Sequence, residues 1–248
     1  VAEMAALAEN AWHQRGEARP LLALLDGPLL FVMGKDVPDR SQLLSIYFGA
    51  MTRLREVNAG LVGYTDRPRS RFAINMLHLL DLAPETVSRS SLANDGRLEG
   101  IRDIALFATF LDPGERSALF VQMSPQNKEF RRAGGDSHEI AFFYLNVAGQ
   151  GEPPKIARVD IPMWVAENRE LVGELQVLIY LQCQELMSRY PYALTRADEL
   201  ALVKFDEARQ LDLMIQVALN RQGVFNSRSD KQKGKDAARS PRTRFEMR

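Results

Sequence analysis

The chain has 248 residues, 46% of them hydrophobic, which is enough for one sizeable α/β core. Its 32 basic and 32 acidic residues balance, so net charge gives no sign of a nucleic-acid-binding protein as a whole. The single cysteine, Cys183, excludes an intramolecular disulfide and a cysteine-based zinc site, and no apolar run is long enough to span a membrane.

Charge is distributed unevenly along the chain. Residues 226–248 contain eight Lys or Arg against three Asp or Glu, so this tail carries +5 and the remainder −5. The tail also lacks apolar periodicity, which is typical of disorder. We therefore predict a folded domain over 1–225 and a basic, disordered tail over 226–248. The sparse cysteine content and the lack of a membrane segment predict a cytoplasmic protein.

The first third of the chain alternates helix and strand patterns. Spacing and run length predict a helix over 1–19, an apolar strand over 21–25 continued by 29–33, a helix over 42–58 capped by Asp39–Ser41, a strand over 61–64 and a helix over 70–80. An unbroken apolar strand is typical of a parallel or mixed sheet with helices on both sides. The order of these elements predicts a βαβ unit with a right-handed crossover.

The remaining two thirds are less regular. The patterns predict a helix over 102–111, strands over 117–123, 140–147 and 155–161, a long helix over 163–188, a helix opening at Pro191, and a last helix from Asp206 to about Gly223. The fold class is therefore α/β.

Asp26 follows the first predicted strand, in a stretch that is otherwise apolar. A buried ionised carboxylate is costly unless it is paired, hydrogen-bonded or bound to a metal. Ligands also gather at the carboxyl ends of strands in α/β sheets, so Asp26 is a candidate metal ligand. Asp-Gly-Pro is equally an ordinary turn that ends a strand, and composition favours neither interpretation.

Two further acids have weaker individual support. Asp198 shares one face of its predicted helix with Leu194 and Ala197. Such an acid either needs a cation or lies at the margin of the apolar stripe and reaches water, which is the more usual case. Glu3 lies in the opening helix, where most glutamates are solvated.

Several basic residues are candidates for phosphate contacts. Arg67, Arg69 and Arg71 crowd the turn after the second strand, which suits either phosphate binding or simple solvation. Arg158 and Asp160 alternate along a strand and face the same side, so they either pair with each other or face the site. No metal is assigned to the histidines, which lack ligand spacing: His13, His78 and His138.

Six segments, taken in order, resemble the NurA family of DNA nucleases. They are Leu24–Leu29, Leu61–Ser70, Leu111–Ser117, Ala141–Tyr144, Ala157–Ala166 and Tyr190–Asp198. The first is similar to the family's Asp-Gly-Ser/Pro-Leu strand end, and the last to its Tyr-Pro-x-x-Leu-x-x-Ala-His segment. No single motif is decisive, and the order and spacing of the segments carry the resemblance.

The resemblance implies a ribonuclease-H-like mixed sheet flanked by helices, and exonuclease or endonuclease action on DNA ends during resection and double-strand-break repair. It implies two divalent ions, Mn²⁺ or Mg²⁺, a homodimer, and a HerA-type hexameric ATPase as partner. Position by position, Asp26 and Glu3 fall on metal-binding positions of the family. Tyr190 and Asp198 fall on its C-terminal Tyr and His positions, which makes Asp198 a third metal ligand. Arg67, Arg69, Arg71 and Arg158 are the expected DNA-binding residues.

Two departures from the family pattern affect the expected site. The family's first Asp-Gly-Ser strand has no counterpart in 1–248, so we expect a fragment that lacks its first strands and does not assemble a complete site alone. Asp198 stands where the family has His, and Asp160 replaces Glu. Two rival functions follow: a catalytically degenerate adaptor that binds DNA and an ATPase, and a metal phosphoesterase acting on RNA or nucleotides.

Overall fold

A computed structural model describes residues 1–17, 19–30, 34, 36–87, 98–135 and 138–201, together with 210, 213–215, 217 and 221. The chain divides into two units, Val1–Asp198 and Glu199–Arg248. All the strands of the described residues lie in the first unit, to which the account below is confined. The predicted last helix begins at Asp206, outside the described residues, and so does the predicted tail.

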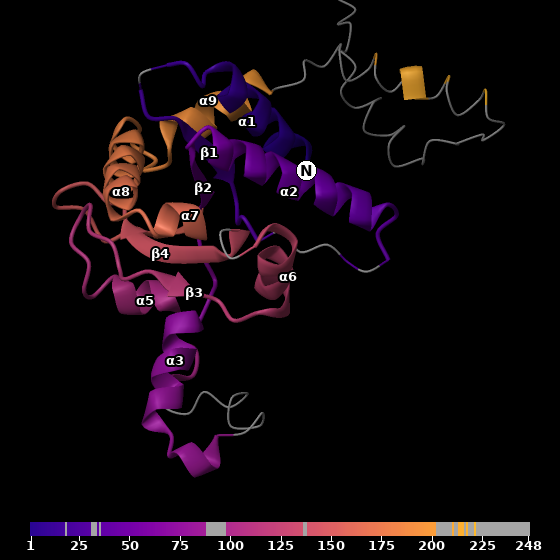
Figure 1. Cartoon of the computed structure of the whole chain (residues 1–248). Coiled ribbons are helices and arrows are strands. Elements are labelled where there is room, and N and C mark those ends of the chain that lie inside the picture. Colours follow the sequence, from indigo (N-terminus) through magenta and orange to yellow (C-terminus); the bar gives the residue numbers. More distant parts are fainter. Residues whose placement is uncertain are drawn as a thin grey trace, which may run out of the picture. The chain divides into compact units, whose positions relative to one another are not determined.

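Helices and strands alternate through the first unit (Figure 1). The strands are β1 (Leu22–Asp26), β2 (Gly60–Thr65), β3 (Phe120–Val121), β4 (Ile140–Asn146) and β5 (Ile156–Pro162). The helices are α1 (Ala2–His13), α2 (Arg40–Glu56), α3 (Phe72–Asp81), α5 (Asp103–Phe107), α6 (Pro125–Gly134), α7 (Met163–Ala166), α8 (Arg169–Gln184) and α9 (Tyr192–Leu200), with a 3₁₀ turn at Pro84–Thr86.

The five strands form one mixed sheet in the order β1-β2-β5-β4-β3. β1 and β2 are parallel and joined through α2, which confirms the predicted strand–helix–strand unit. β2 and β5, β5 and β4, and β4 and β3 are antiparallel. The register places Asp26 opposite Tyr64 and Gly63 opposite Asp160. The predicted α/β class is therefore confirmed, and β1 lies at an edge rather than fully inside the sheet.

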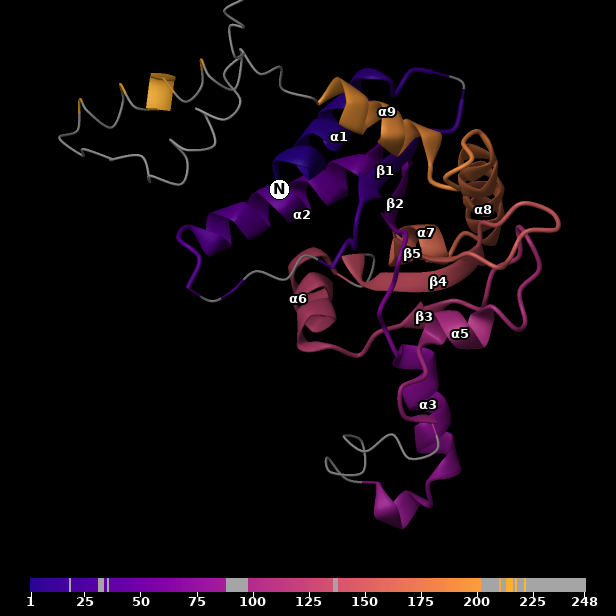
Figure 2. The ribbon, with the colours of Figure 1, turned by 180° about the vertical axis from the view of Figure 1, so that it is seen from behind.

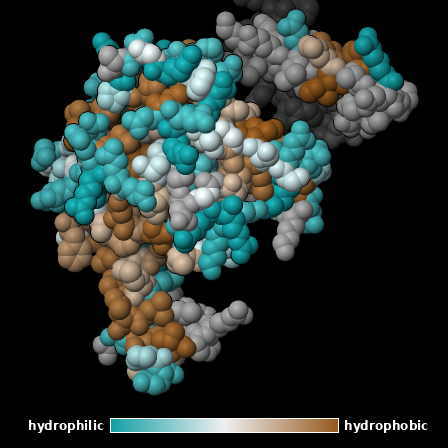
Figure 3. Space-filling model, in the orientation of Figure 1, coloured by the Kyte–Doolittle hydropathy of each residue, from teal (hydrophilic) through white to brown (hydrophobic). Residues whose placement is uncertain are grey.

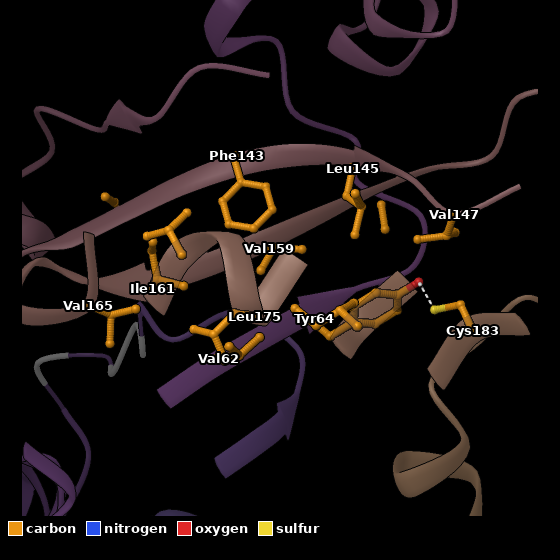
Figure 4. Packing of buried hydrophobic residues seen from close by; sticks show 14 of the residues in the cluster. Val62, Tyr64, Phe143, Leu145, Val147, Val159, Ile161, Val165, Leu175 and Cys183 are labelled. Atoms are coloured by element: carbon orange, nitrogen blue, oxygen red, sulfur yellow. Dashed lines mark hydrogen bonds between the residues drawn. The ribbon is translucent and has the colours of Figure 1, made fainter. Parts of the chain in front are cut away.

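One face of the sheet packs against α7, α8 and α9. Side chains that alternate along β2, β4 and β5 meet apolar residues of α8 such as Leu175 and Ile179. Figure 4 shows this cluster, with the Tyr64 ring against the sheet and its hydroxyl 3.7 Å from the Cys183 sulfur. Cys183 is fully buried in this cluster, and burial raises the pKa of its thiol to about 11.

The opposite face packs against α1, α2, α5 and α6. Met4 and Ala8 of α1 and Met51 and Leu54 of α2 cover the β1–β2 side. Phe107 of α5 stacks on Tyr144 of β4, with ring centroids 4.5 Å apart. Helices on both faces agree with the architecture expected from the apolar strand pattern. α3 extends away from the sheet, as both ribbon views show (Figures 1 and 2).

The middle of the chain departs most from the sequence predictions. Helix α6 was not predicted, although Ser124 caps it by accepting from the Asn127 amide. The predicted strand over 117–123 shrinks to Phe120–Val121 plus one bridge at Arg116. The predicted helix over 163–188 is two helices, because Asn168 opens α8 by capping the Leu171 amide.

Within the described residues, no helix is both long enough and apolar enough to cross a membrane.

Candidate functional site

Asp26 is the last residue of β1 and its side chain is exposed, so the carboxylate does not carry the burial cost that its apolar surroundings suggested. The chain turns at Gly27, whose φ of 103° lies in the region that favours glycine. The Gly27 amide donates to the Tyr64 carbonyl at 2.7 Å, so the end of β1 is held on β2. Asp26 therefore opens an Asp-Gly-Pro turn and, at the same time, presents an exposed carboxylate.

The segment after Asp26 is clamped at Leu29 from two sides. The Leu29 amide donates to Asp160 Oδ2 at 3.1 Å, and the Tyr47 hydroxyl donates to the Leu29 carbonyl at 2.8 Å. Gly63 lets the segment lie directly on β2: a Cβ there would be 2.7 Å from the Gly27 carbonyl oxygen and 2.9 Å from the Leu29 nitrogen. These contacts fix the backbone that carries Asp26.

Tyr190, which lies just before α9, contacts both Asp26 and β2. Its ring packs edge-on against Tyr64, with centroids 5.5 Å apart, and its hydroxyl is hydrogen-bonded to the Asp26 carboxylate. Burial, this hydrogen bond and the charges of Asp26 and Asp198 raise the pKa of Tyr190. The hydroxyl therefore stays protonated at neutral pH and donates to Asp26. Asp198 is exposed on α9, which matches the interpretation in which it reaches water.

Glu3 lies near Asp26 on the other side. Both residues line a hollow of about 360 Å³ whose wall also includes Leu25, Pro28, Leu30 and Tyr47. Glu3 is exposed on the first turn of α1. Asp198 is not part of this wall. Like Asp26, it lies close enough to Tyr190 for its negative charge to raise the pKa of the Tyr190 hydroxyl. The structure thus brings Glu3 and Asp26 into one hollow, with Tyr190 beside Asp26.

Carboxylate oxygens are the ligands that Mg²⁺ and Mn²⁺ prefer. Among the described residues, no group of three or more His, Cys, Asp or Glu side chains is placed to hold a metal ion. Mg²⁺ is commonly held by one or two carboxylates, with waters and substrate phosphates completing its shell. The Glu3–Asp26 pair fits that smaller donor set.

The three arginines after β2 have different surroundings. The Arg67 side chain is 93% exposed, with Nε 3.5 Å from Asp66, and Arg69 is also exposed. Arg71 instead donates to the carbonyls of Ile101 and Leu98, at 2.8 and 2.9 Å. Arg67 and Arg69 are therefore available to an anion, whereas these Arg71 donors hold the backbone of another segment.

Arg158 is largely buried, yet it also lines a hollow of about 270 Å³ together with Arg69, so a DNA contact at this residue stays a prediction. Its Nε donates to Asp160 Oδ1 at 2.7 Å, and its guanidinium lies 3.9 Å from the centre of the Phe142 ring. The side chain is 10% exposed. Burial raises the pKa of Asp160, while Arg158 and the Leu29 amide act in the opposite direction. The pair therefore forms as the alternation along β5 suggested, and it faces the Leu29 clamp.

Sequence reasoning missed three residues that shape this region: Tyr47, Gly63 and Arg102. Tyr47 lies inside α2 and Gly63 inside β2, where no local motif distinguishes them. Arg102 precedes α5, far along the chain from Arg69, yet both line one hollow. Each of the three contacts or faces residues that are distant in sequence and close only in the fold. Local sequence spacing therefore could not predict their roles.

A family model described as the NurA domain matches residues 1–203. No curated protein and no solved structure matches the chain. The matched range contains the sheet, the helices that carry Glu3 and Asp198, and the segment before α9 that carries Tyr190. The chain belongs to the NurA domain family.

Proposed function

We propose that this protein is a divalent-metal-dependent deoxyribonuclease that hydrolyses phosphodiester bonds at DNA ends. The observation that carries the proposal is the meeting of Glu3 and Asp26 in one hollow beside Tyr190. These residues come from α1, β1 and the segment before α9, so the fold assembles them from distant parts of the chain. Membership of the NurA family, a nuclease-type family, supports the same activity.

Asp26 and Glu3 would hold the cation, Mn²⁺ or Mg²⁺, with Asp198 as a candidate for a second ion. When bound, such an ion supplies a Lewis acid and lowers the pKa of a bound water. Tyr190 donates to one Asp26 oxygen and so orients the carboxylate. The Leu29 clamp keeps the Asp26 backbone fixed, which holds the carboxylate in place without rearrangement. Arg67 and Arg69 neutralise phosphates of the DNA strand.

The wider assignment rests on the family. We propose a ribonuclease-H-like architecture, supported by the mixed sheet with helices on both faces. We also propose action in the cytoplasm, in DNA end resection and double-strand-break repair, as a homodimer with a HerA-type hexameric ATPase. Exposed Met76, Leu77 and Leu80 make the projecting helix α3 apolar (Figure 3), and such patches are typical of contact surfaces.

The decisive experiment uses end-labelled single-stranded DNA, duplex DNA and RNA with Mn²⁺, with and without EDTA. We expect metal-dependent release of nucleotides from DNA, and a loss of about 100-fold or more in Asp26→Asn, because one donor to the cation is removed. Asp81→Asn, an exposed aspartate at the end of α3, is the matched control and should remain active. Full activity of Asp26→Asn, or cleavage of RNA alone, would contradict the proposal.

A second candidate is a catalytically degenerate adaptor that binds DNA and an ATPase. The observation favouring it is the small number of metal-binding side chains. Within the described residues, no three His, Cys, Asp or Glu side chains are grouped to hold a metal ion. DNA binding without metal-dependent cleavage, in a chain that folds and melts cooperatively, would select this candidate over the nuclease.

A further inference from the structure

A basic cleft lies beside the turn that follows β2. We use this name for a hollow of about 560 Å³ whose charged wall residues are Asp66, Arg67, Arg69, Arg102 and Lys155. Four cations face one anion, so the wall carries a net charge of +3. Ala105 of α5 and Ala108, the residue after α5, contribute small side chains to the same wall, which leaves the space open. The local charge therefore differs sharply from the neutral chain as a whole.

The cations divide into structural and available groups. Lys155 uses its ammonium on Asp66 at 2.8 Å and on the carbonyls of Ser188 and Arg189, at 2.8 and 3.1 Å. It therefore adds charge but fixes the cleft rather than binding an outside group. Arg69 and Arg102 are both exposed, and their side chains make no ion pair or hydrogen bond with the described part of the chain. Their guanidinium groups are the available donors.

Arg71 holds the two segments that carry these donors. It lies next to the turn with Arg69, and it donates to the carbonyls of Leu98 and Ile101 just before Arg102. The Asp103 amide adds a bond to the Ser70 carbonyl at 3.2 Å. The distance between the Arg69 and Arg102 segments is therefore set by hydrogen bonds, which is the preorganisation that a binding site needs.

The basic cleft and the Glu3–Asp26 hollow both adjoin a third hollow. A connecting hollow of about 270 Å³ shares Pro68 and Arg69 with the basic cleft. The same connecting hollow shares Pro28 and Leu30 with the Glu3–Asp26 hollow. Its remaining wall includes the polar residues Gln122 and Gln126 and the largely buried cation Arg158. Three neighbouring hollows thus lie in series between the basic end and the acidic end.

We propose that the basic cleft is the phosphate-binding track for the DNA strand, with Arg69 and Arg102 as its ligands and Arg71 as a positioning residue. The proposal rests on the proposed nuclease function for the identity of the strand. The guanidinium groups bind backbone phosphates as bidentate donors. The strand then follows the connecting hollow to Asp26, so the cations neutralise phosphates outside the acidic end where hydrolysis is proposed.

The test measures binding of a fluorescein-labelled single-stranded oligodeoxynucleotide by anisotropy in EDTA, over a series of salt concentrations. EDTA prevents cleavage, so binding is read independently of nuclease activity. We expect Arg69→Ala and Arg102→Ala each to weaken binding roughly fivefold, the scale of an exposed ion pair. Each should also reduce the slope of log Kd against log salt by about 0.7. Arg102→Lys keeps the charge and should retain most of the affinity.

Arg169→Ala removes an exposed arginine from the start of α8, away from the cleft, and should bind as the unaltered protein does. Equal affinities for Arg69→Ala, Arg102→Ala and Arg169→Ala would overturn the proposal. Full displacement of the strand by a free deoxynucleoside monophosphate at equal phosphate concentration would also overturn it, because that result marks a site for small phosphates. If Arg102→Ala fails to fold, Arg102→Gln takes its place.

Discussion

Gly63 matters because of the space it leaves rather than because of its backbone freedom. It lies within β2, where the Gly27 carbonyl and the Leu29 amide approach it closely. Any side chain at this position displaces the segment that follows Asp26. The position of the proposed metal-binding carboxylate therefore depends on a residue that carries no functional group of its own.

We expect Gly63→Ala to lower the free energy of unfolding by about 1–3 kcal/mol, since the added methyl group overpacks a closed site. It should also reduce metal-dependent cleavage, because the Asp26 backbone must shift. Gly173→Ala is the matched control: Gly173 is in α8 with nothing within 4 Å of the added Cβ, and the change should stabilise by about 0.5–1 kcal/mol. Urea unfolding measures both. Equal stability changes in the two variants would refute the steric argument.

At the scale of elements, a single buried carboxylate joins α3, α5 and β4. Asp103 is fully buried at the start of α5 and accepts from the amides of Phe72 and Ile74 at 2.7 and 3.0 Å. These amides belong to the first turn of α3, whose donors have no partners within the helix. The Tyr144 hydroxyl of β4 donates to the same carboxylate. Asp103 is therefore the anchor of the projecting helix.

Asp103→Ala should destabilise the protein by about 2–4 kcal/mol, because it leaves several buried donors without acceptors. Tyr144→Phe removes one hydroxyl and keeps the two amide bonds, so a loss of about 1 kcal/mol is expected. Chemical denaturation gives both values. Hydrogen exchange at the first turn of α3 should rise in Asp103→Ala and change little in Tyr144→Phe. Equal exchange in both variants would remove Asp103 from the anchoring role.

The elements show which structures the local sequence predicts. β1, β2, β4 and β5 were found because apolar runs mark them, and α2 and α3 because periodicity does. Ser124-Pro125 and Asn168 are recognisable helix starts, so α6 and the α7–α8 break were within reach of sequence reasoning. Asp39 shows the opposite case. It takes the N-cap position of α2 with φ 56° and no side-chain cap bond, which differs from the capping geometry that its residue type predicts.

The candidate site was predictable only in part. Asp26 stands out because it ends an apolar strand. The clamp on Leu29 joins residues 131 positions apart in the chain through Asp160, and the basic cleft joins Arg69 to Arg102. Such pairings depend on sheet order and on loop paths, which local patterns do not specify. The family match supplies the order of the segments but not these contacts.

At the scale of the whole molecule, ionisable groups define the pH range of stability. Hydrogen bonds from Arg189 and the Gly149 amide lower the pKa of Glu152 to about 2. A lowered pKa stabilises above the unfolded-state value near 4.5, and this contribution is lost as pH falls toward 2. The raised pKa of Cys183, about 11, affects stability at alkaline pH. The contribution of this thiol to the free energy of unfolding is present below pH 9 and is lost as pH rises to about 11.

We therefore expect thermal stability to be highest between about pH 5 and 9. Glu152→Gln should flatten the decline between pH 4.5 and 2, because the group that titrates there is removed. Glu174→Gln, an exposed glutamate on α8, serves as the control and should leave the acid limb unchanged. Melting temperatures across the pH range provide the measurement. If the melting temperature falls as steeply below pH 4.5 in Glu152→Gln as in the unaltered protein, the Glu152–Arg189 ion pair does not contribute as proposed.

The position of β1 at the edge of the sheet has one more consequence. Within the described chain, β1 pairs only with β2, so its other side presents peptide groups that no neighbouring strand uses. An additional strand that pairs with the free edge of β1 would place every second side chain on the same face of the sheet as Asp26. A carboxylate carried by that strand would then enlarge the donor set around Asp26 while leaving every residue of 1–248 unchanged.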